Sequence, residues 1–426
     1  MFKQFLSALW LLFFLSSSAH AVLTIEITKG ADSTLPIAIV PFGGSGQGAV
    51  STDIAKIIRN DLARSGHFSP LAVASLPQQP VSGDQVNFPT WRTLATDYLL
   101  IGQVTSVGGA YNVSFQLFNI PKAEQVLGFS FPARNDNLRR IGHRISDLVY
   151  EALIGEVGAF DSRIAYVSVK HSSKKPYQLN IADMDGADAK AIFSSHEPIL
   201  SPAWSPDGQK LAYVSLENKR NEIYVQHISS GKRESVAKWP GLNSAPAWSP
   251  DGQKLALTLS KDGNAEIYLL DLSNRRLQRL TFNRATDTEA DWAPDGKSLV
   301  FTSDRGGKPQ IYRISAKGGQ AQRLSFSGSS NSRARFSPDG QKLALINGSQ
   351  HGYRIAVQDL SNGQLLTLTQ TTLDESPAFA PNGQMIIYAT GPSLAAVSSD
   401  GQIQQRLAVA GNQGSVREPA WSPRLH

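Results

Sequence analysis

A short phrase recurs six times in the last two thirds of this 426-residue chain. In its second copy, residues 246–252, it reads P-A-W-S-P-D-G. Its aromatic position is spaced 44, 44, 44, 43 and 42 residues apart and is occupied by Trp204, Trp248, Trp292, Phe336, Phe379 and Trp421. A fixed period in the forties, carried by strand-like sequence, is typical of a β-propeller, in which four-stranded sheets surround a central channel.

Each copy predicts a strand, a tight turn and a returning strand. Ser249 to Gly252 has the composition of a type I turn, with glycine at the position that needs a positive φ. Six returning strands are predicted, at 163–169, 210–215, 254–259, 298–303, 342–347 and 385–390. The first lacks the lead-in phrase, whereas a spare copy stands at 419–423. We therefore expect the C-terminal tail to complete the first blade and close a six-bladed, all-β propeller over residues 156–426.

The first 21 residues have the pattern of a secretory signal peptide. Lys3 gives a positive start, 5–15 is an apolar run too short to span a bilayer, and Ala19-His20-Ala21 is an A-x-A cleavage site. The chain has no cysteine, so the new terminus at Val22 cannot carry a lipoprotein anchor. We expect cleavage after Ala21 and an exported protein with no transmembrane segment.

Residues 22–155 change character and predict a small α/β domain ahead of the propeller. Residues 35–42 are typical of a buried strand, and 50–65 and 135–154 space their apolar residues as amphipathic helices do. Gly108-Gly109 predicts a hairpin between two strands. The formal net charge is +6, and the basic residues fall in scattered pairs in predicted loops, so we expect no nucleic-acid partner.

Motifs that carry chemistry are scarce. Residues 44–49 fit G-x-G-x-x-A, but the acidic residue of a dinucleotide site is missing about twenty positions later, so we interpret this as a plain turn. The sequence contains no nucleophile elbow, zinc-protease motif or phosphate loop, and its histidines lack ligand spacing. We therefore predict no catalytic residue, metal or cofactor. The alternative is a secreted propeller hydrolase of the prolyl-oligopeptidase-like type that lacks its catalytic domain.

The mature sequence resembles the TolB family, the periplasmic component of the Tol-Pal envelope system. The resemblance rests on residues 23–30 and 36–42, on Asp374-Glu375-Ser376-Pro377, on 419–423, and on the order of signal, α/β domain and propeller. It implies a monomeric, non-enzymatic adaptor that binds the lipoprotein Pal at the propeller mouth and TolA through its N-terminal segment. It also implies support of outer-membrane integrity and of constriction during cell division, with bacteriocins and outer-membrane proteins as further partners.

Two sets of residues fit these implied roles. Eight residues in loops that lead into inner strands are expected to face Pal, if these loops do more than connect strands: Asn243, Ala245, Thr288, Glu289, Asn331, Arg333, Asp374 and Glu375. Six residues form the segment expected to bind TolA: Val22, Leu23, Thr24, Ile25, Glu26 and Ile27. Their strand-like alternation suits addition to a partner's sheet, and it equally suits the first strand of the α/β domain.

Overall fold

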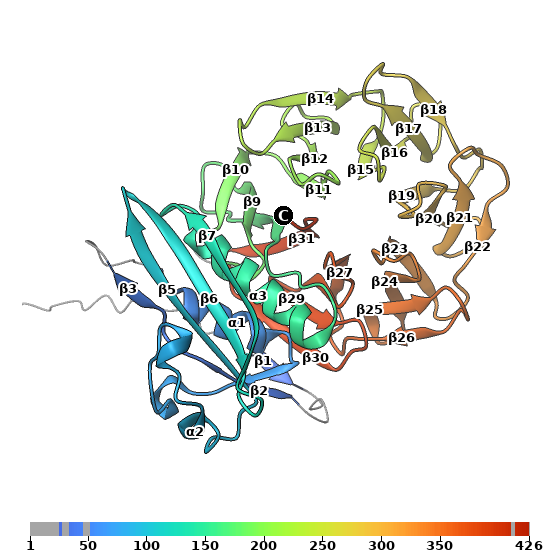
Figure 1. Cartoon of the computed structure of the whole chain (residues 1–426). Helices are drawn as coiled ribbons and strands as arrows, with labels where there is room; N and C mark the ends of the chain where they lie inside the picture. The colour runs from blue at the N-terminus through green and yellow to red at the C-terminus, as the bar shows by residue number, and fades with distance from the viewer. Residues whose placement is uncertain (1–24, 28–33, 46–51, 410–413, 426) are drawn as a thin grey trace, which may run out of the picture.

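The computed structural model describes residues 25–27, 34–45, 52–409 and 414–425. In it, a ring of six β-sheets surrounds a central channel, and a smaller α/β unit lies beside the ring (Figure 1). The six-bladed propeller predicted from the repeat is thus confirmed. We number the blades in chain order, beginning with the sheet that contains 163–169.

Every blade is an antiparallel sheet whose strands follow one another outward from the innermost strand, which lines the channel. Blade 1 contains β8 (Arg163–Val169), β9 (Tyr177–Asp183) and β10 (Lys190–Ser195), with β31 (Ser415–Trp421) as its inner strand. Blade 2 contains β11 (Ile199–Trp204), β12 (Lys210–Ser215), β13 (Glu222–His227) and β14 (Arg233–Ala237). Blade 3 contains β15 (Asn243–Trp248), β16 (Lys254–Leu259), β17 (Glu266–Asp271) and β18 (Leu277–Arg279).

The other three blades repeat this order. Blade 4 contains β19 (Asp287–Trp292), β20 (Ser298–Ser303), β21 (Gln310–Ser315) and β22 (Gln322–Arg323). Blade 5 contains β23 (Ser330–Phe336), β24 (Lys342–Ser349), β25 (Gly352–Asp359) and β26 (Leu365–Thr367). Blade 6 contains β27 (Asp374–Phe379), β28 (Met385–Thr390), β29 (Ser393–Ser398) and β30 (Ile403–Leu407), and β1 (Ile25–Ile27) adds a fifth strand at its outer edge.

The C-terminal strand closes the ring as the spare lead-in phrase predicts. β31 pairs with β8, with Trp421 opposite Ile164. The Trp421 indole Nε1 donates to Ser162 Oγ at 2.8 Å, and Trp248 Nε1 donates across blades to the Ala203 carbonyl at 3.0 Å. Trp248 also packs in one hydrophobic cluster with side chains of blade 2. The repeated aromatic therefore joins neighbouring blades, which a ring needs because one sheet cannot bury both faces alone.

The α/β unit is built on a mixed sheet in the order β4-β2-β5-β6-β7, with β3 paired to β5. Its strands are β2 (Leu35–Ile39), β3 (Gly43–Ser45), β4 (Phe68–Pro70), β5 (Tyr98–Val107), β6 (Ala110–Asn119) and β7 (Glu124–Ala133). Its helices are α1 (Ile54–Arg64), α2 (Phe88–Trp91) and α3 (Leu138–Ile154), with 3₁₀ turns at Val73–Ser75 and Gly83–Gln85. Helix α1 begins later than the apolar spacing predicted because Asp53 caps it, accepting from Lys56 N at 2.9 Å.

The first strand does not join this sheet. β1 pairs antiparallel with β30, placing Ile25 opposite Gln405 and Ile27 opposite Ile403. For residues 25–27, the interpretation as the first strand of the α/β domain is therefore wrong, because their backbone hydrogen bonds go to the propeller edge. Residues 22–24 lie outside the described residues. No helix within the described part of the chain is long and apolar enough to cross a bilayer.

A buried ionic network joins the two units. His143 on α3 contacts Asp61 on α1 through Nδ1 at 2.7 Å, and its Nε2 lies 3.7 Å from Asp183 of the propeller. Burial alone would lower the pKa of His143, but the carboxylates of Asp61 and Asp183 outweigh burial and raise it to about 10. Arg139 ion-pairs with both Asp183 and Asp185. Oppositely charged side chains of the two units therefore pair with each other where the units meet.

Candidate interaction site: the propeller channel and loop face

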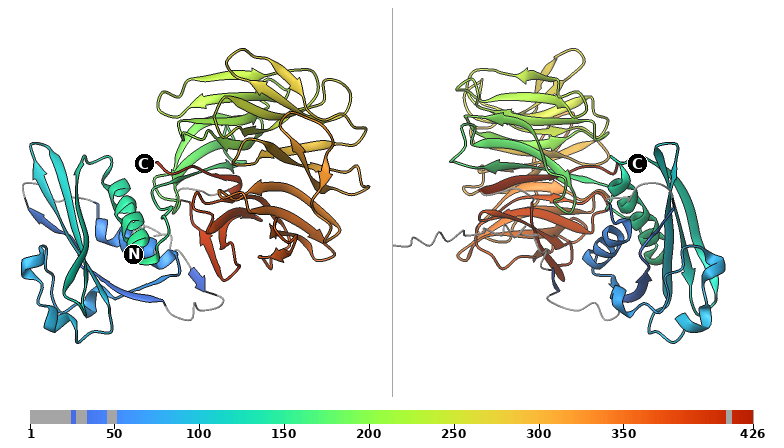
Figure 2. Two further views of the ribbon diagram at one scale, coloured as in Figure 1. Left: turned by 45° about the vertical axis from the view of Figure 1, so that its right-hand side comes forward. Right: turned by 90° about the vertical axis from the view of Figure 1, so that its left-hand side faces the viewer.

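The propeller has two different faces because its strands alternate in direction. The turns that follow the repeated aromatic and the turns that join the third and fourth strands of each blade gather on one face, here called the turn face. The loops that lead into the inner strands and the loops that join the second and third strands of each blade gather on the other, here called the loop face. On the turn face, Asn382 Nδ2 donates to the Val157 carbonyl at 3.1 Å, and Gln384 Nε2 donates to Glu156 at 2.6 Å. The α/β unit thus covers part of the turn face, and Figure 2 shows it on one side of the ring.

Six equivalent residues of the inner strands hold a left-handed backbone. Each lies where the pairing register shifts at a β-bulge. They are Ser201 (φ 50°), Ala245 (φ 47°), Glu289 (φ 56°), Arg333 (φ 55°), Ser376 (φ 58°) and Glu418 (φ 56°). None is glycine, so each position costs on the order of 1 kcal/mol. Strain repeated at one register in every blade marks this ring of residues as a candidate functional feature.

Charged members of this ring meet across the channel. Arg333 Nη1 lies 3.4 Å from Glu418 Oε1, and its Nε lies 4.0 Å from Glu289 Oε1. Glu418 also accepts from the Ser201 backbone N–H at 3.2 Å. Burial alone would raise the pKa of Glu418, but the Arg333 guanidinium outweighs burial and holds it below its usual value. The cluster thus contains an ionised, hydrogen-bonded pair.

A cavity of about 420 Å³ extends from this cluster toward the turn face. Asp291 lies in its wall. Burial raises the pKa of its carboxyl group, although the positive charge of Arg335 acts to lower it. The Asp291 carboxylate also accepts from the Phe336 backbone N–H at 2.9 Å. Ser376 Oγ is buried in the same wall without a hydrogen-bond partner among the described residues. The described residues lining this cavity include no histidine that could act as its base.

Three of the eight predicted Pal-facing residues have buried side chains that hold loops in place. Asn243 donates to the Trp239 carbonyl at 2.7 Å, and Asn331 donates to the Ser327 carbonyl at 2.7 Å. Asp374 accepts from Thr371 Oγ1 at 2.6 Å. Buried loop backbone needs such partners, so these side chains face inward and do not line the rim. The expectation that these three side chains point outward toward a partner is therefore corrected, because they are buried and shape the loops.

The other predicted residues lie around the channel. Thr288, Glu289, Arg333 and Glu375 are partly exposed, and Ala245, one of the six residues with a left-handed backbone, is buried. The structure brings Glu289 and Arg333 together, and it adds Glu418, which the sequence reasoning left out of the set. Aligning the copies of the repeat at one register would have revealed Glu418, because it stands where Glu289 and Arg333 stand in their blades.

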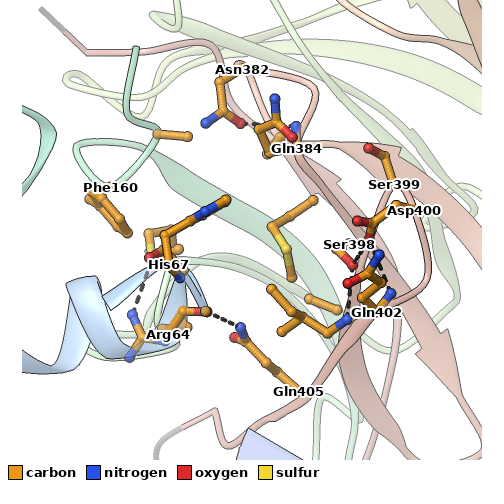
Figure 3. A pocket seen from close by; sticks show the side chains of 18 of the residues that line it. Arg64, His67, Phe160, Asn382, Gln384, Ser398, Ser399, Asp400, Gln402 and Gln405 are labelled. Atoms are coloured by element: carbon orange, nitrogen blue, oxygen red, sulfur yellow. Dashed lines mark hydrogen bonds between the residues drawn. The ribbon is translucent and has the colours of Figure 1, made fainter. Parts of the chain in front are cut away.

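A second cavity, of about 290 Å³, lies between the α/β unit and blade 6 (Figure 3). His67 and Phe160 line one side of it, and Gln402 and Gln405 line the other. Gln405 Nε2 donates to the Arg64 carbonyl oxygen, which ties the two walls together. Because β1 pairs along β30, the described part of the predicted TolA segment runs beside this cavity.

Two protein-family descriptions match the sequence. Residues 23–126 match the TolB amino-terminal domain, and residues 150–425 match the TolB beta propeller domain. Together these matches take in the α/β unit and all six blades.

Individual proteins match over nearly the full length. The Tol-Pal system protein TolB of Thioalkalivibrio sulfidiphilus is 59% identical over 431 residues, covering 99% of this chain and 99% of the relative. The protein of the same name from Nitrosococcus oceani is 61% identical over 415 residues, covering 96% and 95%. The crystal structure of TolB from Acinetobacter baumannii superposes with a TM-score of 0.85 at 42% identity, covering 94% of this chain and 100% of that one.

Proposed function

Because this chain belongs to the TolB family of the Tol-Pal system, we propose that it is a periplasmic protein–protein adaptor. It binds the lipoprotein Pal through the loop face and TolA through residues 22–27. By linking these partners it supports outer-membrane integrity and constriction during cell division. Bacteriocins are further binders of the same surface, and outer-membrane proteins are further partners. The protein reaches the periplasm after cleavage behind Ala21.

The uncovered loop face is the observation that carries this proposal. The α/β unit packs on the turn face, which leaves the loops around the other end of the channel open to a partner. Thr288, Glu289, Arg333 and Glu375 are the proposed direct contacts, because they are partly exposed around the channel. Asn243, Asn331 and Asp374 act indirectly by fixing the loop backbone.

The proposed adaptor binds its partners and catalyses no reaction. A hydrolase working in the channel would need an activated nucleophile or two free carboxylates facing each other. Glu418 is ion-paired with Arg333, and Asp291 is engaged by a backbone N–H. Incubating the mature protein with peptide and glycoside substrates should therefore give no turnover, and genuine turnover would favour the hydrolase alternative.

Titration of the mature protein with the purified periplasmic domain of Pal tests the loop-face assignment. Thr288→Tyr places a bulky ring at the channel mouth and should weaken binding at least about tenfold, a typical loss at an interface centre. Gln341→Tyr adds the same side chain to an exposed turn-face position and should leave the affinity unchanged. Pal binding that Thr288→Tyr does not alter would contradict the loop-face assignment, and absence of Pal binding by the wild type would contradict the adaptor function.

The N-terminal segment is tested separately with the periplasmic domain of TolA. Deleting residues 22–27 should abolish TolA binding, because these residues are the proposed added strand. The same deletion should leave a folded protein that still binds Pal, since β1 pairs with the outer strand of blade 6 and not with the loops of the loop face. TolA binding that survives the deletion would place the TolA contact elsewhere.

A further inference from the structure

The loop face carries an excess of exposed positive charge. Among the residues that the structure describes, its loops expose eight cationic side chains, which form the cationic arc along blades 1 to 4: Lys170, Lys174, Lys175, Lys219, Arg220, Lys238, Arg284 and Lys308. Within the described parts of the same loops, two anionic side chains are exposed, Asp262 and Asp304. Lys219 and Arg220 ion-pair with Glu197 and Glu222, yet their own side chains stay 78% and 59% exposed. The face therefore favours an acidic partner.

The same face also exposes large apolar side chains. Phe282 is 74% exposed and Phe326 is 72% exposed, the highest values among the large apolar residues that the structure describes. Leu373 and Tyr353 are also exposed, and Tyr353 N donates to the Thr372 carbonyl at 2.9 Å, which brings their loops together. Phe282, Phe326, Tyr353 and Leu373 form the apolar arc, which runs from blade 4 to blade 6. Exposed apolar side chains gathered on one face mark an interaction site.

The two phenylalanines are held outward by matching contacts. The Arg279 guanidinium lies 4.7 Å above the Phe282 ring, and the Arg323 guanidinium lies 4.9 Å above the Phe326 ring. Each arginine is fixed in turn, because Arg279 Nε donates to the Thr281 carbonyl at 2.9 Å and Arg323 Nε donates to the Ser325 carbonyl at 2.7 Å. The two pairs stand 44 residues apart in adjacent blades. Rigid aromatic anchors of this kind bind at low entropic cost.

We propose that the loop face docks a partner surface of matching polarity, with carboxylates over the cationic arc and apolar side chains against Phe282 and Phe326. This inference rests on the proposed function and names the chemistry of the Pal surface that meets the propeller. A folded protein suits the separation of the two arcs, because it can present one acidic and one apolar patch. An anionic bilayer presents the same headgroups to both arcs and gives no reason for their separation.

Binding of the Pal periplasmic domain to matched variants tests the arcs. Phe282→Ser with Phe326→Ser should raise Kd at least about 30-fold, mainly through faster dissociation. Phe129→Ser, an equally drastic change on the exposed sheet of the α/β unit, should leave Kd unchanged.

The cationic arc is tested by reversing charge. Lys174→Glu with Lys175→Glu and Lys238→Glu should slow association at least about tenfold at low salt, and added salt should remove this difference. Lys232→Glu with Arg276→Glu and Lys317→Glu makes the same charge change on the turn face and should have little effect.

The outcomes separate the inference from the function on which it rests. If the wild type binds Pal and both loop-face variants bind within twofold of it, the arcs are not the docking surface, and the adaptor function stands. If the wild type fails to bind Pal, the adaptor function fails with it. If the wild type and not the arc variants bind anionic phospholipid vesicles, and Pal does not bind, the loop face meets a membrane and the protein-docking inference is overturned.

Discussion

Arg333 on the inner strand of blade 5 ion-pairs with Glu418 on the C-terminal strand that completes blade 1, so one contact spans the channel between non-adjacent blades. Both residues hold a left-handed backbone, which aims their side chains at the channel. The pair therefore couples the closing strand to blade 5, with blade 6 between them. The free energy that this ion pair contributes therefore bears on the stability of the closed ring.

Replacing one partner of this ion pair should lower the stability of the protein, whereas replacing both partners together should not. Arg333→Met leaves the Glu418 carboxylate buried without its cation, which should lower the free energy of unfolding by about 3 kcal/mol. The double variant Arg333→Met with Glu418→Leu removes both charges and should lie within about 1 kcal/mol of the wild type. Urea unfolding of the single and double variants measures the coupling. Equal losses in the two variants would show that packing, and not charge pairing, is what matters there.

The ring was predictable from sequence because its signals are local and repeated. The lead-in phrase fixes a turn and the start of a strand, and the spare copy at 419–423 indicated how the chain ends meet. The exposure of individual loop residues was predicted less well. Asn243, Asn331 and Asp374 are polar residues in connecting loops, and a sequence does not show that such side chains turn inward to satisfy buried backbone groups.

The β1–β30 pairing and the exposed phenylalanines could not be predicted from the sequence for a different reason. The pairing of β1 with β30 joins segments almost 380 residues apart, and its alternating pattern fits any sheet edge equally well. Phe282 and Phe326 look like core residues in sequence, and only the fold shows that they are exposed. The recurrence of arginine three positions before each of them was a visible signal, because Arg279 and Arg323 are separated by the repeat length.

Ring closure should depend on the shape of Trp421 more than on its hydrogen bond. Trp421→Phe keeps an aromatic ring, as blades 5 and 6 do with Phe336 and Phe379, and loses the bond to Ser162, for a cost of about 1 kcal/mol. Trp421→Ala empties the contact between blade 6 and the closing strand and should cost about 3 kcal/mol or more. Thermal and urea unfolding of both variants measure these losses. Similar losses for Phe and Ala would assign the stabilisation to the hydrogen bond.

The network around His143 should make stability depend on pH above neutrality. Its pKa is raised from 6.5 to about 10, so the protonated imidazole stabilises the fold fully below about pH 6.5, and that stabilisation disappears as pH rises toward 10. The groups facing the imidazole are Asp61 on α1 and Asp183 and Asp185 on the propeller, with Arg64 and Arg139 neutralising part of their charge.

His143→Gln tests this network. The variant should lose about 3 kcal/mol at pH 7, because it leaves the buried Asp61 carboxylate with Arg64 and Ser146 as its remaining partners. Its unfolding free energy should also vary less than that of the wild type between pH 6.5 and 10. Urea unfolding across that range supplies the comparison. Parallel pH profiles for the two proteins would mean that His143 does not titrate there.

The pairing of β1 with β30 should protect backbone amides at the outer edge of blade 6. Deleting residues 22–27 removes the fifth strand, so the amides within 403–405 that face β1 should exchange with solvent at least about tenfold faster. The amides of β14, the outer strand of blade 2, have no such added strand and should exchange alike in both proteins. Hydrogen exchange followed by mass spectrometry resolves both segments. Unchanged exchange at 403–405 would mean that β1 spends little time on this edge in solution, and that the segment is already available for a partner's sheet.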